Sequence, residues 1–187
     1  MTETNRSRPG ALIGVALSGV LLGASLGAIT NSVNGWVSPL YFRNIMRWDD
    51  VQDIWRASIA QGILEGILFG LAFAVIFTAV VGIVSKARSP FGLAAIHLVL
   101  IALSALVCWA LGGMVAMGLA TLSPEFHRHA FRGVPEDFGQ MLRYAWVGGS
   151  IWGIQFGGLA SVIVGSVLFR AKWRHLQEDI HNSTRQP

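Results

Sequence analysis

Residues 62–70 read GILEGILFG, and residues 149–157 read GSIWGIQFG. In both stretches glycine returns at every fourth position, so the three glycines fall on one face of a helix. Apolar side chains fill most of the positions between them. Small residues four apart let two helix backbones approach closely, and such contacts are a common way for helices to associate in lipid. The two stretches therefore indicate membrane-spanning helices that pack through glycine faces.

The composition also favours a membrane protein. Of the 187 residues, 53% are hydrophobic and 13% are charged, whereas about a quarter of the residues of an average soluble domain are charged. The mean hydropathy is +0.55. These values exclude a disordered chain and a disulfide-rich secreted module. The single cysteine, Cys108, excludes an internal disulfide and a CxxC zinc or redox motif.

Four stretches are long and apolar enough to cross a hydrocarbon core, which takes about 20 residues of helix. They cover residues 11–33, 59–84, 91–122 and 144–169, with one acidic residue, Glu65, one histidine, His97, and no basic residue. Each is apolar on all sides, which is typical of a lipid-exposed helix rather than of a soluble amphipathic one. The predicted fold is an all-α integral membrane protein with four transmembrane helices. For the first stretch, a signal peptide that starts at Arg6 and Arg8 is the alternative.

The distribution of basic residues predicts that both termini lie in the cytoplasm, with the protein in the cell membrane. Eight Lys and Arg residues lie in the two tails and the short loop at 85–90, and six lie in the two longer loops on the opposite side. Each longer loop balances three arginines with three acids, so the positive excess lies on the cytoplasmic face. There it can attract anionic lipid headgroups. No nucleic-acid-binding motif is visible, and no nucleic-acid partner is predicted.

The two halves of the chain contain a series of polar residues in the same order. The segment Ser38-Pro39 recurs 85 residues later as Ser123-Pro124, and two arginines, an acidic pair and a third arginine follow in the same order in both halves. Matches among aliphatic residues occur by chance in apolar sequence, so the evidence for a repeat is the shared order and spacing of these polar residues. The predicted organisation is a single membrane domain with a parallel tandem repeat of two helical hairpins. The hairpins cover residues 11–84 and 91–170, the cytoplasmic loop covers 85–90, and the cytoplasmic tails cover 1–10 and 171–187.

All four stretches carry small residues four apart, and these are the predicted helix-packing positions. The sequence leaves open whether they join helices of one chain or of two chains. The positions are Gly19, Gly23, Gly27, Gly62, Gly66, Gly70, Gly112, Gly149, Gly153 and Gly157, with Ser104 and Cys108 in the third stretch.

The longer loops are predicted to form caps on the outer membrane surface, because aromatic residues favour the headgroup zone. A platform for a partner or ligand is the alternative. Asp49-Asp50 and residues 135–137 suit helix N-termini, which predicts that the second and fourth helices begin outside the hydrocarbon. Asp53 and Arg56 are three residues apart and can pair on the first of these extensions.

Glu65 is the strongest candidate for a functional side chain, because an ionisable group inside a span is costly. It lies roughly 9 Å inside its span at 1.5 Å per residue. Gln61 is one turn away, and the two can form a polar patch that faces Asn31, Asn34 or Gln155. A hydrogen-bonded structural glutamate and a proton or ion site are the two interpretations.

Three other groups offer weaker signals. His97 is expected near the cytoplasmic end of its span, roughly 15 Å from Glu65 in depth, as a packed histidine, with haem or pigment ligation as the alternative. Glu125, His127 and His129 alternate as metal ligands can on an extended chain, but a solvated loop is the preferred interpretation. No metal, cofactor or catalytic residue is predicted, because no nucleophile–base pair or phosphate-binding loop is visible.

Two functions fit these observations. The preferred one is a non-enzymatic membrane protein that assembles through its glycine faces, as a homo-oligomer or with a membrane-protein partner. The alternative is a small oligomeric transporter or channel with Glu65, Gln61 and Gln155 near the pathway. The first is preferred because a pathway is expected to expose more polar residues than these helices supply.

Overall fold

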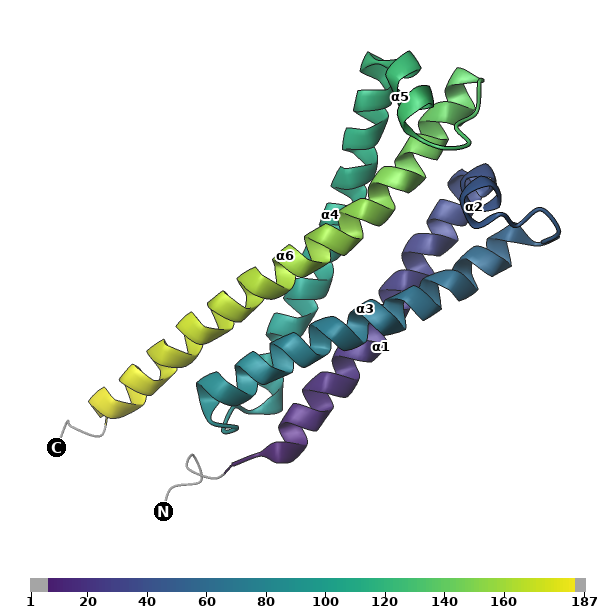
Figure 1. The fold of residues 1–187 in the computed structure, drawn as a ribbon. Helices are drawn as coiled ribbons and strands as arrows, with labels where there is room; N and C mark the ends of the chain where they lie inside the picture. The colour runs from purple at the N-terminus through teal and green to yellow at the C-terminus, as the bar shows by residue number, and fades with distance from the viewer. Residues whose placement is uncertain (1–6, 184–187) are drawn as a thin grey trace.

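A computed structural model of the chain describes residues 7–183, and within this range it contains six helices. Two short ones, α2 (Pro39–Met46) and α5 (Pro124–Ala130), lie at the end of the bundle away from the α3–α4 turn (Figure 1). The prediction of an all-α protein with four helices long and apolar enough to span a membrane is confirmed. These are α1 (Pro9–Val37), α3 (Ile54–Ser85), α4 (Phe91–Leu122) and α6 (Phe138–Ser183).

The helix boundaries follow local capping more than hydropathy. The expected start of α3 at Asp49-Asp50 is wrong, because the helix begins at Ile54. Asp53 is the N-cap, and its carboxylate accepts a hydrogen bond from the Arg56 backbone N–H at 3.0 Å. The expected pairing of Asp53 with Arg56 is present at 3.2 Å. Helix α6 begins directly after Asp137 and continues well past the predicted end of its span.

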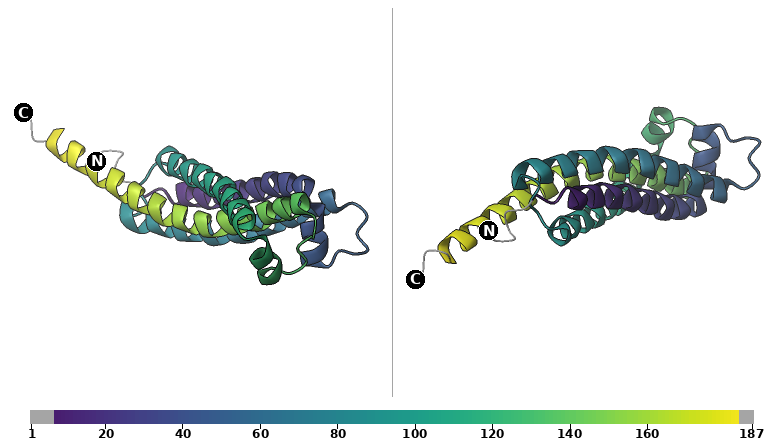
Figure 2. Two further views of the ribbon diagram at one scale, coloured as in Figure 1. Left: turned by 90° about the horizontal axis from the view of Figure 1, so that it is seen from above. Right: turned by 90° about the horizontal axis from the view of Figure 1, so that it is seen from below.

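The four long helices form two hairpins. The most extensive helix contacts join α1 to α3 and α4 to α6, and the contacts between the hairpins are much smaller. Figures 1 and 2 show each pair crossing closely, with α6 projecting beyond the rest of the bundle at the end of the α3–α4 turn. The two hairpins are therefore the well-packed units, and the interface between them is the looser one.

The glycine stripes join the two helices inside each hairpin, which answers the question that the sequence left open. A Cβ on Gly27 would overlap the carbonyl oxygen of Gly62, and a Cβ on Gly112 would overlap that of Gly149. On the second hairpin, Cys108 fills a position in the stripe and touches Gly157. The backbones can approach this closely because no side chain separates them.

The two short helices differ in their surroundings. α2 lies between the hairpins, with the ring centroids of Tyr41 and Tyr144 4.9 Å apart. The Asn44 side-chain amide donates a hydrogen bond to the Gly133 carbonyl at 2.6 Å. α5 packs on α4, and the residues predicted as a solvated loop form this helix instead. Its His127 is buried, so the expectation of a solvated segment is wrong at that position.

Two apolar clusters hold the hairpins together. Near the α3–α4 turn, Val15, Phe77, Leu98 and Phe169 pack together from all four long helices. At the other end, a second cluster centres on Phe42 of α2, with side chains from α3 and α6. Between these clusters the hairpins are less closely packed, and a cavity lies there.

Candidate intramembrane binding site

The cavity lies between the two hairpins and is lined by all four long helices. Its volume is about 110 Å³. On α1 the lining runs from Gly19 to Asn34, a distance of roughly 22 Å at 1.5 Å per residue, so the cavity is long and narrow. The same glycine positions that pack α1 on α3 also border it, since Gly23, Gly27 and Gly66 line it. Of the polar residues of α1 beside the cavity, Thr30 is 3% exposed, Asn31 4% and Asn34 0%, so these side chains are packed between the helices.

Polar side chains gather at the end of the cavity near the short helices. Thr30, Asn31 and Asn34 reach it from α1, Glu65 from α3, and Gln155 from α6. The prediction placed Glu65 opposite Asn31, Asn34 or Gln155, and the structure brings all four to this cavity. The lining contains no Lys, Arg or His from the described residues. The Glu65 carboxyl group consequently has no cationic partner in this cavity.

Glu65 and Gln61 form a hydrogen-bonded pair on α3. The Gln61 amide nitrogen donates to the Glu65 carboxyl oxygen Oε1 at 2.8 Å. Gln61 itself does not line the cavity, whereas Glu65 does. The amide therefore holds one carboxyl oxygen from the side, in the i, i+4 geometry of a helix surface, while the glutamate remains at the cavity wall.

Asn34 joins the two hairpins through its side-chain amide. The side chain is 0% exposed, and the amide lies 3.1 Å from the Ser150 hydroxyl of α6. The same hydroxyl lies 3.0 Å from the Val147 carbonyl. Because a hydroxyl both donates and accepts, it can pair with either atom of the Asn34 amide. Asn34 is therefore a packed contact between the hairpins, with no surface accessible in the cavity.

The other end of the cavity is apolar. Leu98, Ile101 and Ala102 line it from α4, and Val162 lines it from α6. On α3, Phe69 lines the cavity and is also 41% exposed on the outside of the bundle. Phe69 therefore lies at the boundary between the cavity and the surrounding lipid.

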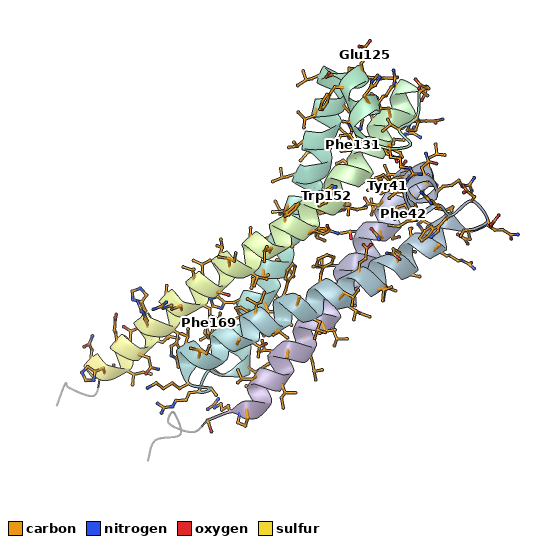
Figure 3. All side chains as sticks on the ribbon, in the orientation of Figure 1. Tyr41, Phe42, Glu125, Phe131, Trp152 and Phe169 are labelled. Carbon is orange, nitrogen blue, oxygen red and sulfur yellow. The ribbon has the colours of Figure 1, made fainter. Side chains whose placement is uncertain are left out.

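Tyr41 connects the short helix α2 with this site. Burial raises the pKa of the Tyr41 hydroxyl above its ordinary value, and the Glu65 carboxylate raises it further. The ring of Tyr41 also packs on Gly148 of α6. Figure 3 shows Tyr41 and Phe42 at the end of the first hairpin that faces α6. The sequence indicated only that the aromatic residues of the longer loops favour the headgroup zone, and no signal in it brought Tyr41 near Glu65.

The remaining candidates lie elsewhere. The His97 ring Nδ1 lies 2.8 Å from the Leu93 carbonyl, and its ring packs edge-on against Phe169, in the cluster near the α3–α4 turn. It does not line the cavity. In the helix α5, Glu125 and His129 are exposed and His127 is buried, so these three side chains do not converge. Residues 7–183 contain no cluster of three or more His, Cys, Asp or Glu side chains that could hold a metal ion.

Comparison with protein-family models, with curated proteins and with solved structures gives no match. The chemistry of the cavity therefore follows from its own residues.

Proposed function

We propose that this chain is a non-enzymatic, multi-pass membrane protein that binds a positively charged solute at Glu65 and moves it, as a small transporter. One observation carries the proposal. Glu65 lines an intramembrane cavity whose lining supplies no cation from the described residues. This carboxyl group calls for a partner from outside the chain, since a charge in lipid is stable only when it is compensated.

The helix packing shifts the preference away from assembly through glycine faces. The glycines of both hairpins are occupied by contacts within the chain, so they offer little surface to a partner. The second argument for assembly was the scarcity of polar residues. However, Glu65 of α3 and Gln155 of α6 both line the cavity, and these two side chains are the polar groups of the proposed binding site.

We further propose that the hairpins are copies of one ancestral unit. In support of this, Gly27 meets Gly62 in the first hairpin as Gly112 meets Gly149 in the second, at the spacing of the sequence repeat. Parallel repeats of this kind move as rigid bodies against one another in transporters. The position of Glu65 holds Trp152 in the second copy, so the charge belongs to one hairpin alone.

In this proposal both termini lie in the cytoplasm and the protein lies in the cell membrane. The end of the bundle at the α3–α4 turn has a crevice whose charged lining is three basic residues and one acid, with Trp173 beside them: Lys86, Arg88, Arg174 and Glu178. Basic side chains beside an interfacial tryptophan suit anionic lipid headgroups. The polar end of the cavity then lies toward the outside of the cell.

The test is flux through proteoliposomes that contain the purified protein. We expect a proton or monovalent-cation flux above that of empty liposomes, and a loss of about tenfold or more in Glu65→Gln, which keeps the hydrogen-bonding shape but removes the charge. Glu125→Gln, at an exposed carboxylate on α5, is the matched control and should behave as the wild type. Equal flux in wild type and Glu65→Gln would count against transport.

A further inference from the structure

We infer that the crevice at the α3–α4 turn binds a phosphate monoester, carried as the headgroup of a membrane lipid. The crevice lies between the end of α3 with its following turn and the extension of α6, so both hairpins supply its walls. Its volume is about 530 Å³, within the roughly 300–1,000 Å³ of small-molecule sites. This site is separate from the proposed transport, and nothing in it depends on Glu65.

Three basic side chains from two parts of the chain line this crevice. Lys86 and Arg88 belong to the turn after α3, and Arg174 belongs to α6. Within residues 7–183 none of the three forms an ion pair, whereas Arg56 and Arg128 at the other end of the bundle each pair with an acid. Like charges that line one crevice without an anion repel one another. Their convergence therefore indicates a place for an anion.

The acid of the crevice does not neutralise these bases. The Glu178 carboxyl oxygen Oε2 lies 3.6 Å from the His175 ring Nδ1, and among the described residues it pairs with no base of the crevice. Three bases and one acid leave an excess of two positive charges. A phosphate monoester carries about −1.5 to −2 charges and three acceptor oxygens, whereas a phosphate diester has no second ionisable oxygen. The monoester therefore matches both the excess charge and the number of basic side chains.

The end of α3 does not require these bases as caps. Lys and Arg side chains near a helix C-terminus often bond its last carbonyls, but here backbone groups take that role. The Gly82 carbonyl accepts a hydrogen bond from the Ala87 N–H at 2.9 Å. The Ser85 carbonyl accepts one from the Arg88 N–H at 3.1 Å. The turn is thus fixed by its own backbone, and the side chains of Lys86 and Arg88 remain available to a ligand.

The depth of the crevice indicates a lipid as the source of the phosphate. Phe169 is the last residue of the fourth apolar stretch, and Trp173 follows it by about one helical turn. The two rings stack with their centroids 6.4 Å apart. Tryptophan favours the headgroup zone, and the lining also includes Val84, the last residue of the second apolar stretch. A headgroup at this level can meet the bases while its acyl chains remain in the hydrocarbon.

The experiment measures the binding of single lipids to the purified full chain in a neutral detergent, by native mass spectrometry. The probes share dioctanoyl chains and differ in their headgroups: phosphatidic acid, phosphatidylglycerol and phosphatidylcholine. We expect phosphatidic acid to bind roughly tenfold or more tighter than phosphatidylglycerol, as expected for an additional charge-assisted hydrogen bond. Phosphatidylcholine, with no net charge, should bind least tightly.

Two arginines of α6 provide a matched pair of variants. Arg174 lines the crevice, whereas Arg170, one turn earlier and equally exposed, does not. Arg174→Gln should weaken the binding of phosphatidic acid by roughly tenfold or more, and Arg170→Gln should leave it close to the wild type. Arg88→Gln should act as Arg174→Gln does. If both arginines hold one phosphate, the double variant should lose less than the product of the two single losses.

The possible results separate a discrete site from a general attraction between the basic face and anionic lipids. Equal weakening by Arg170→Gln and Arg174→Gln would overturn the site, and equal binding of phosphatidic acid and phosphatidylglycerol would overturn the choice of a monoester. Glycerol 3-phosphate, added without lipid, tests the source. If it binds as tightly as phosphatidic acid and depends on Arg174, the phosphate site stands and its lipid source is overturned. Glu65→Gln should leave lipid binding unchanged, so the failure of this site and the failure of transport are distinguishable.

Discussion

The side chain of His127 is buried on α5, where the corresponding position of α2 carries the fully buried Phe42. Its ring packs on Phe131, with ring centroids 4.7 Å apart, and its Nε2 has no partner among the described residues. Burial lowers the pKa of His127 below its ordinary value of 6.5, because burial disfavours the charged imidazolium. The histidine thus acts mainly as an aromatic packing residue.

The lowered pKa predicts a loss of stability on the acid side. In the unfolded chain the imidazole takes up a proton as the pH falls below about 6.5, whereas the folded chain resists it, so folding becomes less favourable as the pH falls. His127→Phe should reduce this loss between about pH 7 and pH 5. The measurement is thermal unfolding in detergent across that range. His129→Phe, at an exposed position of α5, is the control, and an unchanged pH slope in His127→Phe would contradict the assignment.

Glu65 shows how a polar side chain inside a span depends on its neighbours. Gln61 holds one carboxyl oxygen, and the glycines around it bring α1 close enough for Asn31 and Asn34 to reach the same cavity. The second hairpin has Trp152 at the matching position, and this tryptophan stacks on Phe156 with ring centroids 5.3 Å apart. The first hairpin thus carries a carboxyl–amide pair at this level, whereas the aligned stretch of the second carries an aromatic pair.

At the level of the helices, the glycine contacts determine how closely each hairpin can pack. The overlaps at Gly27 and Gly112 are with the backbone of the opposite helix, which cannot rotate away as a flexible side chain can. Gly118 lies on the same helix as Gly112, but a Cβ there would meet nothing within 4 Å. Gly112 and Gly118 thus differ in their surroundings, because the backbone of α6 lies against Gly112 and no other atom lies close to Gly118.

This contrast gives a matched pair of variants. Gly112→Ala should force α4 and α6 apart and cost about 1–3 kcal/mol of unfolding free energy, as overpacking usually does. Gly118→Ala should be close to neutral, because the new methyl group points into open space. Unfolding in mixed micelles with a denaturing detergent measures both. Equal destabilisation by the two changes would show that these glycines matter for backbone flexibility rather than for helix contact.

The long helices were largely predictable from hydropathy, because a helix that crosses lipid needs a long run of apolar side chains. Helix α4 coincides with its predicted span, since Pro90 and Ser123-Pro124 stop it at both ends. Helix α6 runs to Ser183, beyond the apolar stretch that ends at Phe169. Hydropathy cannot predict such an extension, because a helix that is already formed can propagate through polar residues without an apolar run.

The site was predictable only in part. Glu65, Gln155 and Asn31 were expected to lie together, because few polar residues occur in the spans and each needs a partner. The hydrogen bond from Ser150 to Asn34 joins residues of different hairpins, and it depends on how the hairpins dock. Neither helical periodicity nor the repeat contains that information, and the placement of Tyr41 beside the site depends on the same docking.

For the whole molecule, the two short helices differ in their position relative to the two hairpins. Helix α2 lies between the hairpins and joins them through Tyr41 and Asn44, whereas α5 lies on the side of its own hairpin. Neither short helix contributes a residue to the lining of the cavity. At its apolar end, Leu98, Ile101 and Val162 of the lining belong to the cluster around Phe77 and Phe169.

The orientation across the membrane is tested with single cysteines in a Cys108→Ala background. Gln52, in the α2–α3 loop, and Gln177, on the extension of α6, are both exposed. In intact cells a membrane-impermeant thiol reagent should label Gln52→Cys and not Gln177→Cys, because Gln52 is proposed to lie outside. After the membrane is opened, both should react. The reverse pattern in intact cells would invert the proposed topology.

Helix α6 is continuous from Phe138 to Ser183, and Figure 2 shows its final turns standing clear of the other helices. The part beyond Phe169 is roughly 21 Å long at 1.5 Å per residue. The second hairpin thus ends in a continuous stretch of helix that projects beyond the other helices. Ser183 lies roughly 42 Å along α6 from Gln155 of the cavity. A tilt of this hairpin by about 10° about the level of Gln155 would therefore move the end of α6 by roughly 7 Å, so that a rearrangement around Glu65 is measurable far from the cavity.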